Sequence, residues 1–540
     1  MIKSIKHLIT GAMLFGGFFH LQAQPTESWR DFDFVRHSEV WLSGYNASGL
    51  TWLPDTVRTI SIAEIYARKD NGKFVNYYQS DNSFTAGALT ESFFRLNRKV
   101  VFYGKINYDN FTGQNMAGSA FINPDNHLFD IVETGYANSG QKQIEQYHLI
   151  GAVGARLTQS FSIGGKIDYL AANYAKHKDL RHKNSMLDMT ASLGFVWQIA
   201  DAVEIGANYI YRRNIEGVEF DRKGTTDRLY DPFIDLGIFY GRTEIFPIPA
   251  GGSGYTNSKT PAFSQFNGAA LQINLNLAPG LRFFNEFSAL KRTGYFGSKS
   301  DAKIIFSEHE GTGLAYLGKL SFTPSQQQQH FLKFNFGYDL LTNYEIVWRP
   351  ENIVGSVSGI EVFGKSKALD KGLTNFGLEY NAYLGIKDYC PSWIISAGGN
   401  YTDRQQLVSI YPFYREQDIN WWDAWVSATK RVISGKNQDE FSLGLLYGKG
   451  GGEMKNDGVL ATISPDSRAP YSGDNLLLKE YEYLTAKRVT GTVGYGYTRM
   501  FRPNLRGFMR FELGLTRAFG LSAPNEDIFH SLRLSVGCNF

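Results

Sequence analysis

The feature that most constrains the fold of this chain is an alternation of apolar with polar or small residues, which recurs in segments of about ten residues. In residues 100–109, for example, Phe102 and Ile106 share one face of an extended strand, while Lys105 and Asp109 share the other. A strand with lipid on one side and water on the other requires this pattern. Half-buried strands of soluble sheets show it too, but many such segments in series favour a membrane barrel.

The connections between these segments differ in length in a regular way. Short turns join the segments in pairs, and long polar stretches such as 216–262 and 404–420 separate the pairs. The turns fall at residues 96–98, 158–160, 200–201, 278–280, 324–329, 387–391, 434–439 and 502–504. Short turns at one rim and long loops at the other are typical of outer-membrane barrels, with the short turns in the periplasm and the loops outside the cell.

These eight turns imply sixteen strands, and an opening strand near 57–67 and a closing strand at 527–540 raise the number to about 18, within a range of about 14 to 20. We therefore predict an all-β fold over residues 57–540, a transmembrane antiparallel up-and-down β-barrel.

The last strand carries the most specific signal. Leu534, Val536 and Phe540 share one face, and the chain stops on Phe540. This pattern resembles the C-terminal strand of bacterial outer-membrane proteins. The resemblance implies that the barrel-assembly machinery recognises these residues.

The N-terminus predicts export. Lys3 and Lys6 precede an apolar run, Leu8–Phe19, which is too short for a membrane span of about 20 residues, and Ala23 is a small residue at a cleavage position. Residues 1–23 are therefore predicted to be a signal peptide, cleaved near Ala23, and residues 24–56 a periplasmic N-terminal segment. This segment is too short for the plug domain of a TonB-dependent transporter, so we expect a plain, porin-like barrel.

Composition excludes several other classes of protein. Aromatic residues make up 15% of the chain, which suits aromatic girdles at a membrane surface. A net charge of +3 gives no support for nucleic-acid binding, and two cysteines allow neither a disulfide scaffold nor a multi-cysteine metal module. We expect no cofactor and no metal, and we expect contact with outer-membrane lipid and lipopolysaccharide.

The Ala23–Gln24 junction, the Gly- and Tyr-rich strands and the segment 103–108 resemble outer-membrane barrels of Bacteroidota. Within these barrels, the chain is similar to a family known only as a domain of unknown function. The resemblance implies an outer-membrane β-barrel and supplies no active residues. Asp55, Thr56 and Val57 match the three-residue O-glycosylation pattern of that phylum, and the sequence does not decide whether Thr56 is modified.

Charged residues on the predicted inner face are the candidates for lining the lumen. Two interpretations stay open: the charges select solutes by size and charge, or they pair across neighbouring strands and keep the lumen hydrated. Arg506 and Arg510 share one face, which suggests the hypothesis of a path for anions. The lumen-lining candidates are Lys105, Arg156, Lys166, Arg282, Lys333, Arg488, Arg506, Arg510 and Glu512.

Other side chains are candidates for ligand binding or catalysis. Trp421 and Trp425 share an inner face and are candidates for stacking on a sugar ring or another flat ligand. His530 and Ser531 are adjacent in a strand, so they point to opposite faces and do not form a base–nucleophile pair. His148 has no obvious serine partner in the sequence. We therefore expect that the protein is not an enzyme.

The sequence favours a channel or uptake component for small solutes across the outer membrane. The alternative is a surface receptor or accessory subunit of an uptake complex, which would act through its extracellular loops and bind an outer-membrane partner protein. A barrel enzyme is the third and least favoured function. The sequence does not identify the solute, and it does not show whether the lumen is open or plugged.

Overall fold

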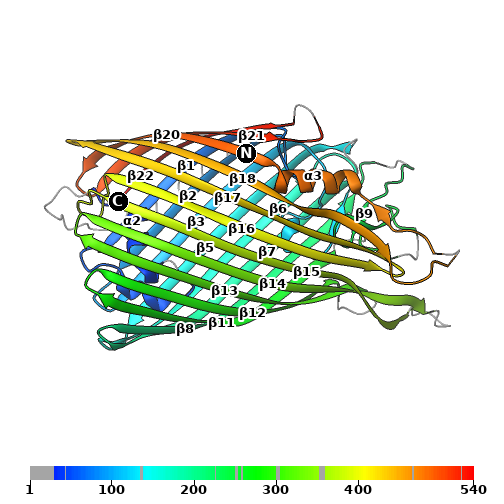
Figure 1. Cartoon of the computed structure of the whole chain (residues 1–540), viewed down its shortest axis with the longest axis horizontal. Helices are drawn as coiled ribbons and strands as arrows, with labels where there is room; N and C mark the ends of the chain where they lie inside the picture. Colours follow the sequence, from blue (N-terminus) through cyan, green and yellow to red (C-terminus); the bar gives the residue numbers. More distant parts are fainter. Residues whose placement is uncertain are drawn as a thin grey trace.

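The computed structural model describes residues 29–540, except residues 43, 134–137, 225–226, 250–252, 257–259, 299–303, 352–358, 465–466 and 524–525. The predicted signal peptide, residues 1–23, lies outside the described residues. The chain forms one closed barrel of 18 antiparallel strands (Figure 1). Among the described residues, no helix is both long and apolar enough to cross a bilayer.

Each barrel strand pairs with its neighbours in the sequence, and β1 pairs with β22 to close the wall. The strands are β1 (Thr59–Gly72), β2 (Asn82–Arg95), β3 (Val100–Met116), β5 (Gly140–Arg156), β6 (Phe161–Lys176), β7 (Arg181–Ala200), β8 (Val203–Asp221), β11 (Thr260–Ala278), β12 (Leu281–Gly297), β13 (Ile305–Ser325), β14 (Gln328–Glu351), β15 (Gly359–Leu384), β16 (Trp393–Ile410), β17 (Phe413–Ser434), β18 (Asn437–Val459), β20 (Lys487–Arg502), β21 (Leu505–Phe519) and β22 (Ile528–Asn539).

The predicted fold and strand number are confirmed. All eight predicted short turns join consecutive barrel strands, from the β2–β3 turn to the β20–β21 turn, and they lie at one rim, the short-turn end. The outer face is apolar, as contact with lipid requires. Side chains that are between 42% and 70% exposed on it include Leu193, Leu271, Phe287, Phe336, Leu443, Val493, Leu513 and Leu534.

The prediction of a long loop over residues 404–420 is wrong. β16 and β17 continue through this range and are joined by Tyr411 and Pro412 alone. The strands persist because their inward polar side chains have partners inside the barrel. Arg404, for instance, donates two hydrogen bonds to the carboxylate of Glu480, at 2.8 and 3.2 Å.

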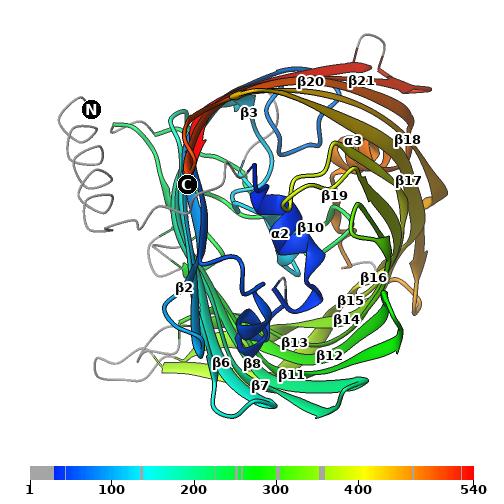
Figure 2. The same ribbon diagram turned by 90° about the vertical axis from the view of Figure 1, so that its left-hand side faces the viewer.

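The sequence leaves open whether the N-terminal segment plugs the lumen, and the structure places its described part inside the barrel. Residues 29–56, other than residue 43, form an N-terminal plug inside the wall at the short-turn end (Figure 2). The plug contains α2 (Phe32–Ser38) and the 3₁₀ helices η1 (Val40–Leu42) and η2 (Ala47–Trp52). Its apolar side chains pack with inward residues of the wall. Each turn of helix buries side chains against the barrel, and a short segment is therefore enough to fill this end.

Glycines in the wall let the plug approach closely. The Cβ of an alanine at Gly154 would lie 2.7 Å from the carbonyl oxygen of Ala47, and at Gly194 it would lie 2.6 Å from Asn46 Oδ1. At Gly164, between these strands, it would overlap the backbone nitrogen of Ser48. Three adjacent strands therefore need glycine where η2 lies against them.

Long connections between the barrel strands fold inward and fill the opposite end of the lumen. Three long connections contribute a small sheet, the loop sheet, made of β4 (Asp130–Val132), β9 (Phe233–Asp235), β10 (Tyr240–Thr243) and β19 (Tyr471–Ser472). The connection before β4 also holds a 3₁₀ turn, η3 (Pro124–Asn126), and the one after β19 holds α3 (Asp474–Thr485). The sheet is tied to the wall by Arg415 of β17, whose Nη1 donates to the carbonyl oxygen of Ile238 at 3.2 Å.

Replacing Gly164 with alanine should loosen the plug without opening the barrel wall, because the added methyl group overlaps η2 rather than a neighbouring strand. Trypsin should then cleave the purified variant within residues 29–58 faster than it cleaves the wild type.

Gly337→Ala is the matched control. Gly337 also lies in a barrel strand, but its nearest neighbour for a new Cβ is the Cβ of Asn375 at 3.8 Å. Equal cleavage of both variants would contradict the close fit between η2 and the wall.

Candidate functional site

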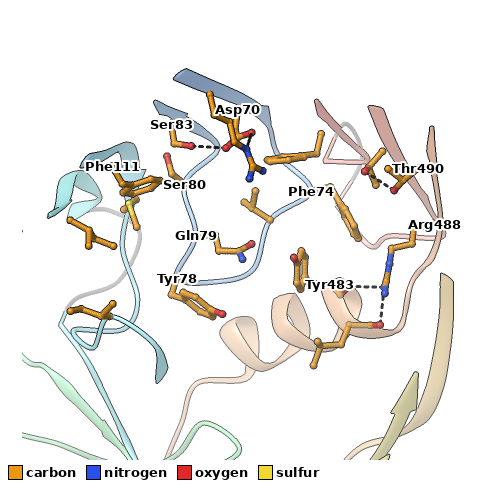
Figure 3. Close-up of a pocket in the computed structure, with 18 of the residues that line it drawn as sticks. Asp70, Phe74, Tyr78, Gln79, Ser80, Ser83, Phe111, Tyr483, Arg488 and Thr490 are labelled. Atoms are coloured by element: carbon orange, nitrogen blue, oxygen red, sulfur yellow. Dashed lines mark hydrogen bonds and ion pairs between the residues drawn. The ribbon is translucent and has the colours of Figure 1, made fainter. Parts of the chain in front are cut away.

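A cavity of about 510 Å³, here named the main cavity, lies next to the loop connecting β1 and β2 (Figure 3). A more open space of about 640 Å³ lies elsewhere, beside residues of β14 to β18. The β1–β2 loop, residues 73–81, forms one side of the main cavity, the C-terminal part of α3 forms another, and inward side chains of the wall complete it. The lining residues are Arg68, Asp70, Phe74, Val75, Tyr78, Gln79, Ser80, Ser83, Phe111, Met116, Ile122, Ile144, Tyr174, Asp423, Leu446, Tyr483, Leu484, Arg488, Thr490, Thr516 and Phe529.

Aromatic rings line this cavity. Phe74 and Tyr483 pack together with ring centroids 5.3 Å apart, and Tyr78 adds a third ring to the lining (Figure 3). The Tyr78 hydroxyl donates to Asp125 Oδ2 at 3.3 Å. Burial, followed by the nearby charge of Asp125, raises the pKa of Tyr78, so its hydroxyl stays protonated at neutral pH.

The charged groups of the main cavity are paired. Arg68 Nε donates to Asp70 Oδ1 at 2.8 Å, and Arg488 Nη2 donates to Asp423 Oδ1 at 2.6 Å. Arg488 is fixed further because its Nη1 donates to the carbonyl oxygen of Leu484 at 3.1 Å. With two arginines and two aspartates among its lining residues, the cavity has no net formal charge.

The loop between β1 and β2 is held by hydrogen bonds rather than by apolar packing alone. The amide of Asn76 donates to Gln79 Oε1 at 2.9 Å, and Ser80 Oγ donates to the carbonyl oxygen of Gln114 at 2.7 Å. These bonds leave the Gln79 amide nitrogen next to the cavity (Figure 3). The loop is therefore held in place by its own hydrogen bonds.

Two smaller cavities follow along the inner face of β21 toward the short-turn end. The second, about 170 Å³, is lined by Glu64, Glu512, Arg510 and Arg533 among others, and the third holds only about 20 Å³. Arg510 borders both of them, and Thr516 of the same strand borders the main cavity. The available space thus narrows along one wall toward the plug.

The plug closes the narrow end with a buried ion pair. Arg431 of β17 contacts Asp31 of the plug at 2.8 Å and Glu440 of β18 at 2.6 Å. Burial opposes ionisation of Asp31, but Arg431, the Phe34 amide and more distant arginines together hold the pKa of Asp31 below its usual range. This pair must separate for the N-terminal end of the plug to leave the wall.

The predicted lumen-lining residues fall into three groups. Three of them bind the plug: Arg156 donates to the carbonyl oxygen of Thr51, Arg282 binds Glu39 at 3.0 Å, and Lys166 lies over the ring of Tyr45. The cavity series contains four: Arg488, Arg506, Arg510 and Glu512. The remaining two lie on the inner face away from these cavities: Lys333 is 3.7 Å from Glu379, and Lys105 lies near Asp168.

The other candidates lie elsewhere. Trp421 and Trp425 are inside the wall, but neither lines the main cavity: Trp421 packs under the guanidinium of Arg404, and Trp425 leans over Gly398. Leu534, Val536 and Phe540 lie half exposed on the outer face of β22, at the closing pair of strands. Their recognition by an assembly machinery stays a prediction.

Sequence reasoning missed the aromatic residues that form the main cavity. Phe74, Tyr78 and Tyr483 belong to connections between the barrel strands, where the sequence pattern predicts polar loops. Aromatic residues in connections, as in Tyr77-Tyr78 and Tyr481–Tyr483, were the signal that these segments fold inward.

One serine–histidine pair was also missed. Ser264 Oγ lies 2.9 Å from His309 Nε2, and Arg292 Nη2 donates to the same oxygen at 3.0 Å. Neither Ser264 nor His309 lines any of the cavities named above. Within the described part of the chain, no three His, Cys, Asp or Glu side chains are grouped to hold a metal.

Residues 50–540 match the family of unknown function DUF6850. The chain belongs to this family. The match includes every barrel strand and begins within η2 of the plug. No curated protein matches the chain.

Solved structures give weak likenesses. The ferric preacinetobactin receptor BauA from Acinetobacter baumannii is 8% identical with a TM-score of 0.39, over 89% of this chain and 80% of that chain. The alcaligin outer membrane receptor FauA from Bordetella pertussis is 8% identical with a TM-score of 0.37, over 90% and 76%. The toluene transporter TodX from Pseudomonas putida is 9% identical with a TM-score of 0.31, over 96% and 99%. Likenesses at these scores assign no function to a member of the DUF6850 family.

Two buried carboxyls should make the loop sheet sensitive to pH. Burial raises the pKa of Asp130, and burial raises the pKa of Asp235 to about 8. The two residues face each other across β4 and β9, and Asp130 accepts a hydrogen bond from Tyr77, next to the main cavity. A raised pKa means that the folded state binds the proton more tightly, so this stabilisation is present at low pH and is lost as pH rises through about 8.

We therefore expect faster hydrogen exchange in residues 233–243 at pH 9 than at pH 6, beyond the intrinsic effect of pH. Asp235→Asn should reduce this difference, because the amide oxygen still accepts the Gly237 and Tyr240 N–H groups but does not titrate. A variant with the same pH dependence as the wild type would show that Asp235 does not control the loop sheet.

Proposed function

We propose that this protein is an outer-membrane barrel that takes up small polar solutes through its lumen, and that its plug keeps it closed at rest. The observation that carries this proposal is the series of cavities along the inner face of β21, whose volume decreases from about 510 to about 170 and then about 20 Å³ toward the plug. A barrel of this strand number encloses enough space for a lumen path, as porin-sized barrels do.

The length asymmetry of the connections supports an orientation. Short turns lie in the periplasm and long connections outside the cell in outer-membrane barrels. This orientation puts the plug at the periplasmic side and the main cavity toward the outside, where a solute arrives. In this arrangement the protein is exported, and its apolar outer face contacts lipid and lipopolysaccharide.

The charge of the path changes along its length. The main cavity is neutral, whereas Arg431, Arg506 and Arg510 gather at the third cavity around Asp31 and Asp33 of the plug. When the plug moves, its two carboxylates leave and the arginines face the path. We propose that these arginines then attract partial negative charge on a passing solute.

A second candidate function has one specific observation in its favour. The loop sheet and the plug fill both ends of the lumen, as a receptor or accessory subunit with a blocked lumen would require. Such a subunit would be recovered with an outer-membrane partner protein. The order of the cavities favours uptake over this alternative.

The test is the ionic conductance of the purified protein in planar bilayers. The wild type should conduct weakly, and a variant lacking residues 29–56 should conduct several-fold better, since the narrow end is then open. Arg431→Gln should give intermittent openings, because Asp31 loses its buried partner.

Heat-dependent mobility of the barrel on gels shows whether each variant is folded before its conductance is interpreted. A folded deletion variant with the conductance of the wild type would contradict a plugged uptake path. Gly337→Ala serves as the unaffected control.

A further inference from the structure

We propose that the main cavity is a binding site for a short neutral oligosaccharide. The inference rests on the proposed function where it identifies the oligosaccharide as the transported solute. The existence of the binding site does not depend on transport. It is carried by the joint presence of aromatic faces, paired ions and hydroxyl groups around one space of about 510 Å³ (Figure 3). A volume of this size falls within the usual range of small-molecule sites, about 300–1,000 Å³.

The aromatic rings supply flat apolar surfaces. Tyr78 and Tyr483 are each partly exposed toward the cavity, while Phe74 is buried behind Tyr483 and fixes its ring at a centroid distance of 5.3 Å. A pyranose ring presents C–H groups on its faces and hydroxyl groups at its edge. Such a ring packs its C–H face on an aromatic ring while its hydroxyls reach polar groups at the side.

The polar groups supply donors and acceptors together. Arg68 and Asp70 form one adjacent pair and Arg488 and Asp423 another, at 2.8 and 2.6 Å. A hydroxyl both donates and accepts, so one sugar hydroxyl accepts from a guanidinium and donates to the neighbouring carboxylate. Hydroxyl groups of serine and threonine add further partners, from Ser80, Ser83, Thr490 and Thr516.

The charge balance selects against ionic ligands. Each arginine of the cavity already binds a carboxylate, so a carboxylate or phosphate would compete with Asp70 or Asp423 and be repelled by it. A purely apolar ligand would bury these ion pairs with no compensating bond, which costs free energy. A ligand with many neutral hydroxyls and apolar ring faces satisfies both requirements.

The test uses the full protein, purified in a detergent without a sugar headgroup and titrated by calorimetry. The probes are maltotriose, cellotriose and mannotriose as neutral trisaccharides, trigalacturonate as an anionic one, and toluene and trialanine as non-sugars. We expect at least one neutral trisaccharide to bind, and to bind better than trigalacturonate, toluene and trialanine. No binding of any neutral trisaccharide, or preferred binding of one of the other probes, would overturn the proposal.

Single substitutions test whether the sugar binds in the main cavity. Tyr483→Ala and Tyr78→Ala should each weaken binding roughly tenfold through loss of a stacking face, and Tyr483→Phe should retain it. Tyr45→Ala is the control, since Tyr45 is a plug aromatic that is 46% exposed and does not line the main cavity. Equal loss in the control would place the sugar elsewhere.

Uptake through the lumen and oligosaccharide binding in the main cavity can be refuted independently of each other. Sugar binding that is weakened by Tyr483→Ala, without any conductance in the plug-deleted barrel, would retain the site and refute uptake. Conductance through the plug-deleted barrel without sugar binding would retain uptake and refute the oligosaccharide.

Discussion

Hydrogen bonding between β1 and β22 is the interaction on which the rest of the structure depends. Lipid offers no partner for a free N–H or carbonyl group, so a sheet in a membrane must have no open edge. The two strands pair from Ile62 opposite Asn539 to Gly72 opposite Phe529, and Ser61 and Phe540 exchange backbone hydrogen bonds of 2.8 and 3.0 Å. The pairing that closes the wall therefore extends as far as Phe540.

Closure of the wall creates an interior that must be polar and largely filled. Side chains alternate between the two faces, so an apolar outside imposes a hydrophilic inside. The plug and the inward connections fill this interior by binding its charges. Glu133, in the connection after β4, is fully buried between Lys142 and Lys176 of the wall, which ties that connection to β5 and β6. Isolated buried charges would be costly, so the connection and the wall depend on each other.

Between the filled ends, space remains beside the inner faces of β20 to β22, and this is where we propose that a solute binds. The main cavity lies where the β1–β2 loop and α3 meet the inner faces of β20 to β22. Phe74, Tyr78 and Tyr483 come from connections, whereas its four charged residues all come from strands. Rigid strands thus position the ion pairs, and the inward connections bring the rings against them.

The wall was predictable from the sequence, and its contents were not. The alternation of residues such as Phe102, Lys105 and Ile106 indicates which face contacts lipid, because every strand of such a barrel needs an apolar outer face and a polar inner face. The nine predicted inner-face residues lie inside, but their partners depend on contacts between distant segments. Arg156 binds a plug residue more than a hundred positions away. The glycines that contact η2 cannot be distinguished in the sequence from the many other glycines of the chain, so the close approach of η2 was not predictable.

Closure of the wall by β1 and β22 can be tested with a disulfide between the two strands. Ala63 of β1 lies opposite Cys538 of β22, and directly opposed residues in antiparallel strands have Cα atoms about 4.5–5.5 Å apart, within reach of a disulfide.

Ala63→Cys in the background Cys390→Ser should therefore form a disulfide with Cys538 under mild oxidation in the membrane. Mass spectrometry should detect the linked peptide that contains residues 63 and 538. If the two thiols stay unlinked while the barrel is folded, the wall is not closed by these strands in this register.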